Sequence, residues 1–324
     1  MYRLCGEPVD PGLASLIHMH VRILGTAAGG GVPQWNCACA NCSGIRSGTS
    51  RIRRRTQSSV AVSAEGKRWF LLNASPDLRV QIESFGPLAP PPGNIRGSSL
   101  EGVLLSNADL DHTLGLFMLR EGPRLPVHAS GATRSALETG LRTTSVLEPY
   151  AGLEWREPGS EFQPLLTRER QPSGLSFAFL PILGKAPRYL GAAARMFPGA
   201  SVVMRIRDEK TGGELIYAPA VAIMDEPLIA AMREADLLLL DGTFFGEEEM
   251  RLTMTGSLTA HDMGHLPVGG EDGSLVRIRS LPARSKAYVH INNTNPMLDE
   301  SSAEYREVRN AGWEIAEDGW SLAP

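Results

Sequence analysis

The sequence predicts an α/β protein in which two β-sheets pack face to face and helices cover both outer surfaces, a four-layered αββα sandwich. Two observations predict this class. The 324-residue chain presents the same order of elements twice, a hairpin followed by apolar strands and a helix. Several apolar strands run directly into polar loops, as in α/β folds that place functional side chains at strand ends. No linker or change of composition divides the chain, so one domain is expected over residues 19–324, after an N-terminal extension over residues 1–18.

The composition is that of an ordinary globular protein, with 42% hydrophobic residues, 21% charged residues and a net charge of −4. This weak acidity provides no basic field, so no nucleic-acid partner is expected. No stretch approaches the ~20 apolar residues that a membrane span requires, so no span is expected either. The first residues lack the basic and apolar segments of a secretory signal, which favours a cytoplasmic location.

In the first half of the chain, strands are expected over residues 21–25, 60–62, 69–72, 103–105 and 126–129. The second and third of these flank a turn and predict a hairpin. A glycine-rich segment over 26–33 carries no phosphate-binding motif, and we expect it to shape the floor of a site. A helix is expected after Gly115, where apolar residues cluster again.

In the second half, strands are expected over residues 175–180, 201–206, 214–217, 235–241 and 287–290. Two of them, 201–206 and 214–217, flank Thr211-Gly212-Gly213 and predict a second hairpin. Helices are expected over 225–234 and 302–310. The stretch from 140 to 180 gives little other signal, and 187–198 is expected to be an irregular loop that can cover a pocket.

A polar cluster follows the strand over 103–105 and contains Asp109, Asp111 and His112. Carboxylate and imidazole groups at a strand end are ligands for Zn, Fe(II), Mn or Mg. The alternative is that an aspartate merely caps the next helix. A second strand-end histidine, His290, follows the strand over 287–290 and favours the metal interpretation. Asp241 ends another buried strand, and His265 lies in a third polar cluster over 261–267.

Three of the four cysteines, Cys37, Cys39 and Cys42, are crowded into a Cys-x-Cys-x-x-Cys motif. Thiolates at this spacing in a cytosolic chain favour a structural Zn²⁺ that holds a loop in place. A closed tetrahedral site needs a fourth ligand, which can be Cys5, a histidine or an aspartate. The alternatives are three free thiols or an iron–sulfur cluster.

Residues 51–55 form a basic run. A solvated charged face is its default interpretation. The functional alternative is that Arg54 and Arg55 bind substrate carboxylates, because arginine pairs with carboxylates through two parallel hydrogen bonds.

Several specific strings resemble the coenzyme pyrroloquinoline quinone (PQQ) synthesis protein B family, which has a metallo-β-lactamase fold. They are Trp35-Asn36-Cys37 and, among others, the segments 23–31, 55–59, 73–77, 217–219, 263–266 and 290–296. The resemblance extends from about residue 19 to the end of the chain. It implies the αββα sandwich and a place in PQQ synthesis, with other proteins of that pathway as partners. It leaves open whether the chain forms a homodimer.

The chain departs from the superfamily at its metal loop, where the usual pattern is His-x-His-x-Asp-His. Asn107 and Asp109 stand at the first two histidine positions, and only Asp111 and His112 are kept. Pro219-Ala220 replaces the Gly-Asp that supplies a bridging carboxylate. The last metal histidine is matched by His290. A dinuclear zinc hydrolase site is therefore incomplete. Two histidines and one carboxylate remain, which is the composition of the facial triad of non-haem Fe(II) oxygenases, although one zinc or another divalent ion also fits.

The resemblance also bears on the cysteine cluster, which is similar to a structural zinc site in phosphodiesterase-like members of the superfamily. Those proteins use as fourth ligand a histidine three residues after their last metal histidine. Asn293 occupies that position here, so the fourth ligand stays open.

The resemblance and the remaining ligands imply a metal-dependent oxygenase, with Fe²⁺ the favoured active-site metal, that hydroxylates the tyrosine-derived ring of a Glu–Tyr cross-linked precursor. Asp111, His112 and His290 are its expected catalytic metal ligands, and His265 or Asp241 its expected proton-handling or substrate-contacting groups. The alternative is a carrier that binds PQQ or its precursor for transport to the periplasm. Hydrolysis, the superfamily's default activity, is disfavoured by the missing ligands, although one zinc ion and a water can still support it.

Overall fold

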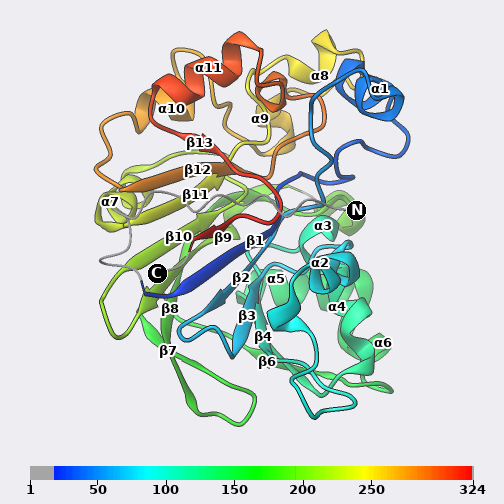
Figure 1. Ribbon diagram of the computed structural model, residues 1–324, viewed down its shortest axis with the longest axis vertical. Coiled ribbons are helices and arrows are strands. Elements are labelled where there is room, and N and C mark those ends of the chain that lie inside the picture. The colour runs from blue at the N-terminus through cyan, green and yellow to red at the C-terminus, as the bar shows by residue number, and fades with distance from the viewer. Residues whose placement is uncertain (1–17, 194, 323–324) are drawn as a thin grey trace.

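The structure, a computed structural model, describes residues 18–193 and 195–322 (Figure 1). Most of the predicted N-terminal extension, and with it Cys5, lies outside the described residues. The described chain forms two seven-stranded sheets, in the orders β14-β1-β2-β3-β4-β5-β6 and β13-β12-β11-β10-β9-β8-β7. Among the described residues, no helix is long and apolar enough to cross a membrane.

The first sheet contains the strands β1 (His20–Gly25), β2 (Ser59–Ser63), β3 (Trp69–Leu72), β4 (Leu100–Leu104), β5 (Leu125–His128), β6 (Leu153–Arg156) and β14 (Ser321–Leu322). The second contains β7 (Gln163–Leu166), β8 (Pro172–Lys185), β9 (Met196–Asp208), β10 (Glu214–Ala218), β11 (Leu237–Asp241), β12 (Ser285–Val289) and β13 (Glu314–Ile315). Both predicted hairpins, β2–β3 and β9–β10, are antiparallel pairs as expected.

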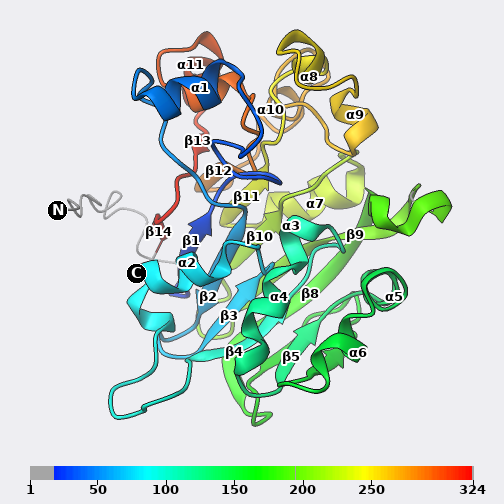
Figure 2. The ribbon, with the colours of Figure 1, turned by 90° about the vertical axis from the view of Figure 1, so that its right-hand side faces the viewer.

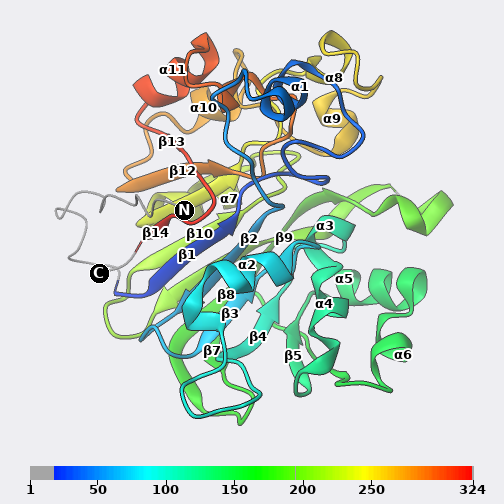
Figure 3. The ribbon, with the colours of Figure 1, turned by 45° about the vertical axis from the view of Figure 1, so that its right-hand side comes forward.

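The helices beside the first sheet are α2 (Leu78–Ser84), α3 (Leu110–Thr113), α4 (Gly115–Met118), α5 (Gly131–Ala136) and α6 (Thr143–Leu147). Those beside the second sheet are α1 (Ala40–Ser47), α7 (Glu226–Glu234), α8 (Glu249–Leu252), α9 (Ala260–Met263), α10 (Ser274–Arg277) and α11 (Ala303–Asn310). The views in Figures 1 and 3 show these two groups on opposite sides of the paired sheets.

The core is divided into three apolar layers, as a four-layered sandwich requires. Strand β11 shows the division, because Leu237 and Leu239 pack between the sheets while Leu238 and Leu240 pack under the helices of the second sheet. A third cluster joins the first sheet to its helices through residues such as Leu71. Strands buried on both faces explain the continuous apolar runs in the sequence. The predicted fold class is confirmed.

The parallel strands of both sheets end at one edge of the molecule. β3, β4 and β5 run parallel in the first sheet, and β10, β11 and β12 in the second. Ala27, just after β1, bridges to both Gln57 and Ile291 and so joins the two sheets at this edge. The loops that follow β4, β11 and β12 therefore converge, although they are far apart in the sequence.

The sequence did not predict several short elements and misplaced one loop. β13 and β14 have two residues each, and helix α1 buries only Cys42 and Ile45, so none gives a periodic signal. The loop expected over 187–198 is shorter, because β8 and β9 continue to pair as far as Lys185 and Met196. The tip of this long hairpin is a 3₁₀ segment, η5 (Arg188–Ala193).

Candidate metal centre

The first part of the site is the loop that connects β4 to α3. His112 is 1% exposed, and its Nδ1 lies 2.7 Å from Oδ1 of Asn107. An amide oxygen only accepts, so this contact puts the ring proton on Nδ1 and leaves the lone pair on Nε2. Nε2 is buried and has no hydrogen-bond partner. A buried nitrogen lone pair without a donor is what a metal ligand requires.

The second part is His290, which directly follows β12. Its φ of 57° is left-handed, a conformation that is unfavourable for a residue with a side chain and that ends the strand abruptly. The ring Nδ1 lies 2.7 Å from the Thr243 hydroxyl, and Nε2 lies 3.0 Å from Oδ2 of Asp111. The turn thus aims the imidazole across the seam between the two sheets.

Asp111, His112 and His290 therefore meet at one place. Oδ2 of Asp111 lies 3.0 Å from His290 Nε2 and 3.9 Å from His112 Nε2. All three ligand atoms lie within 4.8 Å of one another. One carboxylate oxygen and two imidazole nitrogens fit a divalent transition metal. Asp109 occupies the N-cap position of α3, but its side chain makes no capping bond there and instead accepts from Asn107 Nδ2.

A second cluster supports the first and is built around the Thr243 hydroxyl. This hydroxyl donates to Oδ1 of Asp241 at 2.6 Å and lies 3.1 Å from Nδ1 of His265. Nδ1 of His265 lies 2.7 Å from Asp241 Oδ2, and its ring stacks on His290 with the centroids 5.4 Å apart. The Val221 main-chain N–H donates to the same carboxylate. Asp241 thus orients His265, and Thr243 links Asp241 to His290.

The electrostatics keep the ligands in the forms that bind metals. Burial lowers the pKa of His112 to about 4, so its ring is neutral at pH 7. Burial disfavours the Asp111 carboxylate, but His112 and His290 outweigh it and hold the pKa of Asp111 below its usual range. Burial also opposes charge on His265, yet Asp241 raises the pKa of His265 above its ordinary value.

The glycine-rich segment after β1 forms one wall of the site, in agreement with the expected floor-shaping turn. The Cβ position of Gly29 lies 3.4 Å from Asp111 Oδ2, which places this segment in van der Waals contact with the carboxylate. Gly30 has a φ of 95°, which favours glycine. Its N–H donates to Oε1 of Gln57.

The substrate-binding roles predicted for Arg54, Arg55 and Asp241 stay predictions. Arg54 is exposed and Arg55 is buried. The Arg55 guanidinium donates to Thr26 Oγ1 and to the main-chain oxygen of Ala316, which anchors the C-terminal segment. Asp241 is 2% exposed, and protein donors occupy both of its oxygens. Its position is that of a group that orients another side chain.

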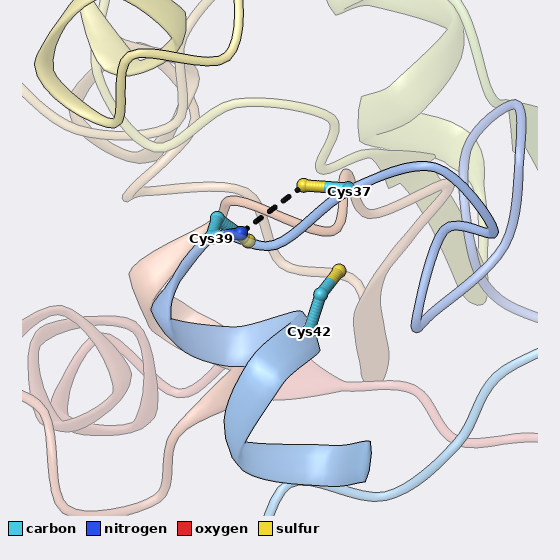
Figure 4. Close-up of side chains that lie close together, drawn as sticks. All are labelled: Cys37, Cys39 and Cys42. Carbon is cyan, nitrogen blue, oxygen red and sulfur yellow. Dashed lines mark hydrogen bonds between the residues drawn. The ribbon is translucent and has the colours of Figure 1, made fainter.

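The cysteine cluster forms a second candidate metal site beside the first. The thiols of Cys37, Cys39 and Cys42 face a common space, with Cys42 on α1 and the other two just before it (Figure 4). Nδ2 of Asn293 lies 3.2, 3.6 and 3.4 Å from the three sulfur atoms in that order. Asn293 therefore occupies the fourth position around the thiols. Burial raises the pKa of the Cys42 thiol to about 11.

With the fold and both sites described, three comparisons place the chain among known proteins. A beta-lactamase superfamily domain matches residues 68–291. The coenzyme PQQ synthesis protein B of Pseudomonas putida is 40% identical over 94% of this chain and 100% of that protein. The chain belongs to the coenzyme PQQ synthesis protein B family. This confirms the family predicted from the sequence motifs.

Solved structures agree with this family. The crystal structure of Zn²⁺-bound PqqB from Methylobacterium extorquens matches with a TM-score of 0.86 at 38% identity, over 94% of this chain and 100% of that one. A diphosphatase of the PhnP family matches with a TM-score of 0.63 at 21% identity, over 95% and 97% of the two chains, and shows likeness of fold alone. Zinc binding by a family member agrees with the three groups of possible metal ligands found here, Cys37–Cys39–Cys42, Asp111–His112–His290 and Asp241–His265–His290, of which the last two share His290.

Sequence reasoning missed Asn107 as an orienting group and Thr243 altogether. Asn107 was noticed only as the replacement of a superfamily histidine. Thr243 lies two residues beyond Asp241 at the same strand end, and this adjacency was the available signal. Its contacts with His265 and His290 depend on the convergence of three loops.

Thr243→Val tests the role of the threonine hydroxyl. The variant keeps the side-chain shape but leaves His290 Nδ1 and Asp241 Oδ1 without their shared partner. We expect the affinity of the Asp111–His112–His290 site for Zn²⁺ to fall by about 10- to 100-fold. Competition with a chromophoric chelator measures this, and the cysteine site is the internal reference. Thr243→Ser keeps the hydroxyl and should bind Zn²⁺ like the wild type. An equal loss of Zn²⁺ affinity in both variants contradicts the expectation.

Glu249 is a buried carboxyl group that joins α8 to the loop after His290, and its ionisation should make the stability of the fold depend on pH. Its carboxylate accepts from Thr294 Oγ1 at 2.5 Å and from the Phe245 N–H at 2.8 Å. Burial raises its pKa from an ordinary 4.5 to about 7. The folded chain therefore holds the proton more tightly than the unfolded chain. The free energy of unfolding should decrease as the pH rises from 4.5 through 7, by up to about 3 kcal/mol for a pKa shift of this size.

Glu249→Gln removes this titration. We expect the difference in melting temperature, variant minus wild type, to be larger at pH 8.5 than at pH 5. Thermal unfolding of both proteins at the two pH values measures this difference. Glu248→Gln, at the exposed neighbour that pairs with Arg251, is the matched control and should show no such change. Parallel pH profiles for Glu249→Gln and the wild type contradict the assignment.

Proposed function

We propose that this chain is an oxygen-dependent hydroxylase of PQQ synthesis that acts on the tyrosine-derived ring of a Glu–Tyr cross-linked precursor. The observation that carries the proposal is the ligand set of one carboxylate and two histidines, Asp111, His112 and His290, with the Nε2 of His112 buried and unpartnered. This is the composition of the sites that hold non-haem Fe(II). When bound there, iron(II) supplies open coordination positions and the redox chemistry that dioxygen requires.

The missing superfamily ligands support one metal ion at this site in place of two. Asn107, which stands at a histidine position, uses its oxygen to orient His112 and its amide nitrogen to bind Asp109. Pro219, which follows β10, carries no ligand group. The carboxylate that bridges the two metal ions of dinuclear hydrolases is therefore missing. Asp241, His265 and His290 also lie close enough together to hold an ion, but main-chain N–H groups already donate to both oxygens of Asp241.

The surrounding residues orient the ligands and hold protons. Thr243 fixes the ring of His290, and Asp241 fixes the ring of His265 and favours its protonated form. A protonated imidazole stacked on a metal ligand is placed to give a proton to an oxygen atom at the site. In the overall reaction one atom of O₂ enters the ring and the other leaves as water, which consumes two electrons and two protons. A two-electron donor is therefore required as a co-reactant.

The test is reconstitution of the chain with Fe(II) without oxygen, followed by addition of O₂, the Glu–Tyr precursor and ascorbate as the electron donor. The proposal expects a product heavier by one oxygen atom, which carries ¹⁸O when ¹⁸O₂ is supplied. The zinc-loaded chain is the control and should give no such product. Tight binding of the precursor or of PQQ without any change of mass rejects the hydroxylase and favours the carrier.

We also propose that the cysteine cluster holds a structural zinc ion, separate from the active-site metal. Three thiols select zinc over the harder ions, while the Asp111–His112–His290 set accepts iron. Metal analysis of the iron-loaded chain should then find both elements. Treatment with a thiol-blocking reagent should release only the zinc.

A further inference from the structure

The long hairpin β8–β9 reaches the metal centre from the side. Its end projects between α9 and α5 in Figures 2 and 3. At the tip, the Tyr189 hydroxyl donates to the main-chain oxygen of Ala108 in the metal loop, at 2.7 Å. At the end of β8, the Cβ position of Gly264 lies 3.1 Å from Cβ of Lys185, directly before His265. The hairpin thus contacts the site at two points.

Lys185 is the cation that the hairpin brings to this place. Its Nζ donates to the main-chain oxygen of Asp262 in α9. The Asp262 carboxylate accepts a capping bond from the Thr259 N–H and forms no ion pair with the ammonium group within 4.0 Å. The site's carboxylates are paired with imidazoles, Asp241 with His265 and Asp111 with His290. Within residues 18–193 and 195–322, no ion pair includes Lys185, so its charge has no carboxylate partner.

Lys185 lies beside the segment that leads from α9 to His265. Its Cβ packs against Gly264, the residue before His265, and its Nζ reaches the main-chain oxygen of Asp262, three residues before His265. Because the side chain is only half-buried, the ammonium group is also open to a ligand in solution.

We propose that Lys185 binds a carboxylate of the substrate and so places an anionic, amino-acid-derived ring beside Asp111, His112 and His290. The inference rests on the proposed function and names its substrate class. A tethered ammonium without a protein counter-ion next to a metal centre favours an anionic ligand, because both charges attract it.

The test measures binding to the zinc-loaded chain, so that it does not depend on turnover. Calorimetry compares the Glu–Tyr precursor with its fully methyl-esterified form in the wild type, Lys185→Met and Lys185→Arg. We expect Lys185→Met to weaken binding of the acid by about 10- to 100-fold, as for a lost charged hydrogen bond, and binding of the ester by less than about 3-fold. Lys185→Arg should retain most of the affinity.

The matched control is Lys210→Met, in the turn between β9 and β10 at the other end of strand β9, which should bind like the wild type. Equal weakening of acid and ester in Lys185→Met overturns the inference, because it indicates a structural role of the tether to α9. Unchanged binding of the acid overturns it as well. A charge-dependent loss together with failure of the oxygenation assay supports the anion site while it rejects the hydroxylase.

Discussion

His112→Ala is expected to remove the ion from the metal centre and to lower hydroxylase activity by about 10³-fold or more. The buried Nε2 of His112 has no hydrogen-bond partner and lies within 4.8 Å of the ligand atoms of Asp111 and His290, which is the arrangement that a bound ion requires. Loss of one of three protein ligands leaves Asp111 and His290 to each other, and they are already 3.0 Å apart. They then form a closed hydrogen-bonded pair.

Element analysis after gel filtration in Fe(II) gives the direct measurement, and the zinc of the cysteine cluster reports whether the fold is intact. His261→Ala is the matched control, because His261 is exposed on α9 and pairs with Glu247 away from the three ligands. It should keep both metals. A His112→Ala protein that retains iron and product formation contradicts the assigned ligand set.

The sequence allowed the fold class, and the meeting of three candidate ligands, to be predicted for one physical reason. Strands buried on both faces give uninterrupted apolar runs, and the residues just after them stand out as polar. Asp111, His112 and His290 each follow such a strand, and the structure brings them within 4.8 Å of one another. The same signal found Asp241, although its burial beneath His265 was not visible from the sequence.

What could not be predicted depends on contacts between distant segments. The contacts of Thr243 arise because β11 and β12 end side by side, and its position two residues after Asp241 is the only mark that it carries in the sequence. Lys185 lies in an extension of β8 that the sequence assigned no structure, and its importance comes from packing against Gly264. The sequence also gave no sign that the Arg55 guanidinium donates to the main-chain oxygen of Ala316 in the C-terminal segment, and its predicted role in substrate binding stays a prediction.

The cysteine cluster carries the second large effect. Cys42→Ala should abolish zinc binding there and lower the melting temperature by about 10 °C, as expected when a few kcal/mol of metal-coupled stability is lost. Cys42 is fully buried and holds α1 against the loop that contains Asn293. That loop begins with His290, so loss of zinc should also weaken iron binding at the metal centre. The two metal sites are linked along the chain by a short segment, because Asn293 lies only three residues after His290.

Asn293→His tests the link between the two metal sites by strengthening zinc binding at the cysteine cluster, where Cys42→Ala removes it. Asn293 Nδ2 lies 3.2 to 3.6 Å from the three sulfur atoms, but an amide nitrogen is a hydrogen-bond donor and cannot serve as a metal ligand. Imidazole is a far better fourth ligand for zinc. We expect zinc loss to a chromophoric chelator to slow by about 10-fold or more, with iron binding unchanged or tighter. Asn293→Ala is the control and should release zinc faster than the wild type. If both variants release zinc at the wild-type rate, residue 293 does not lie at the zinc site. In that case the segment from His290 to Asn293 does not couple the two metal sites.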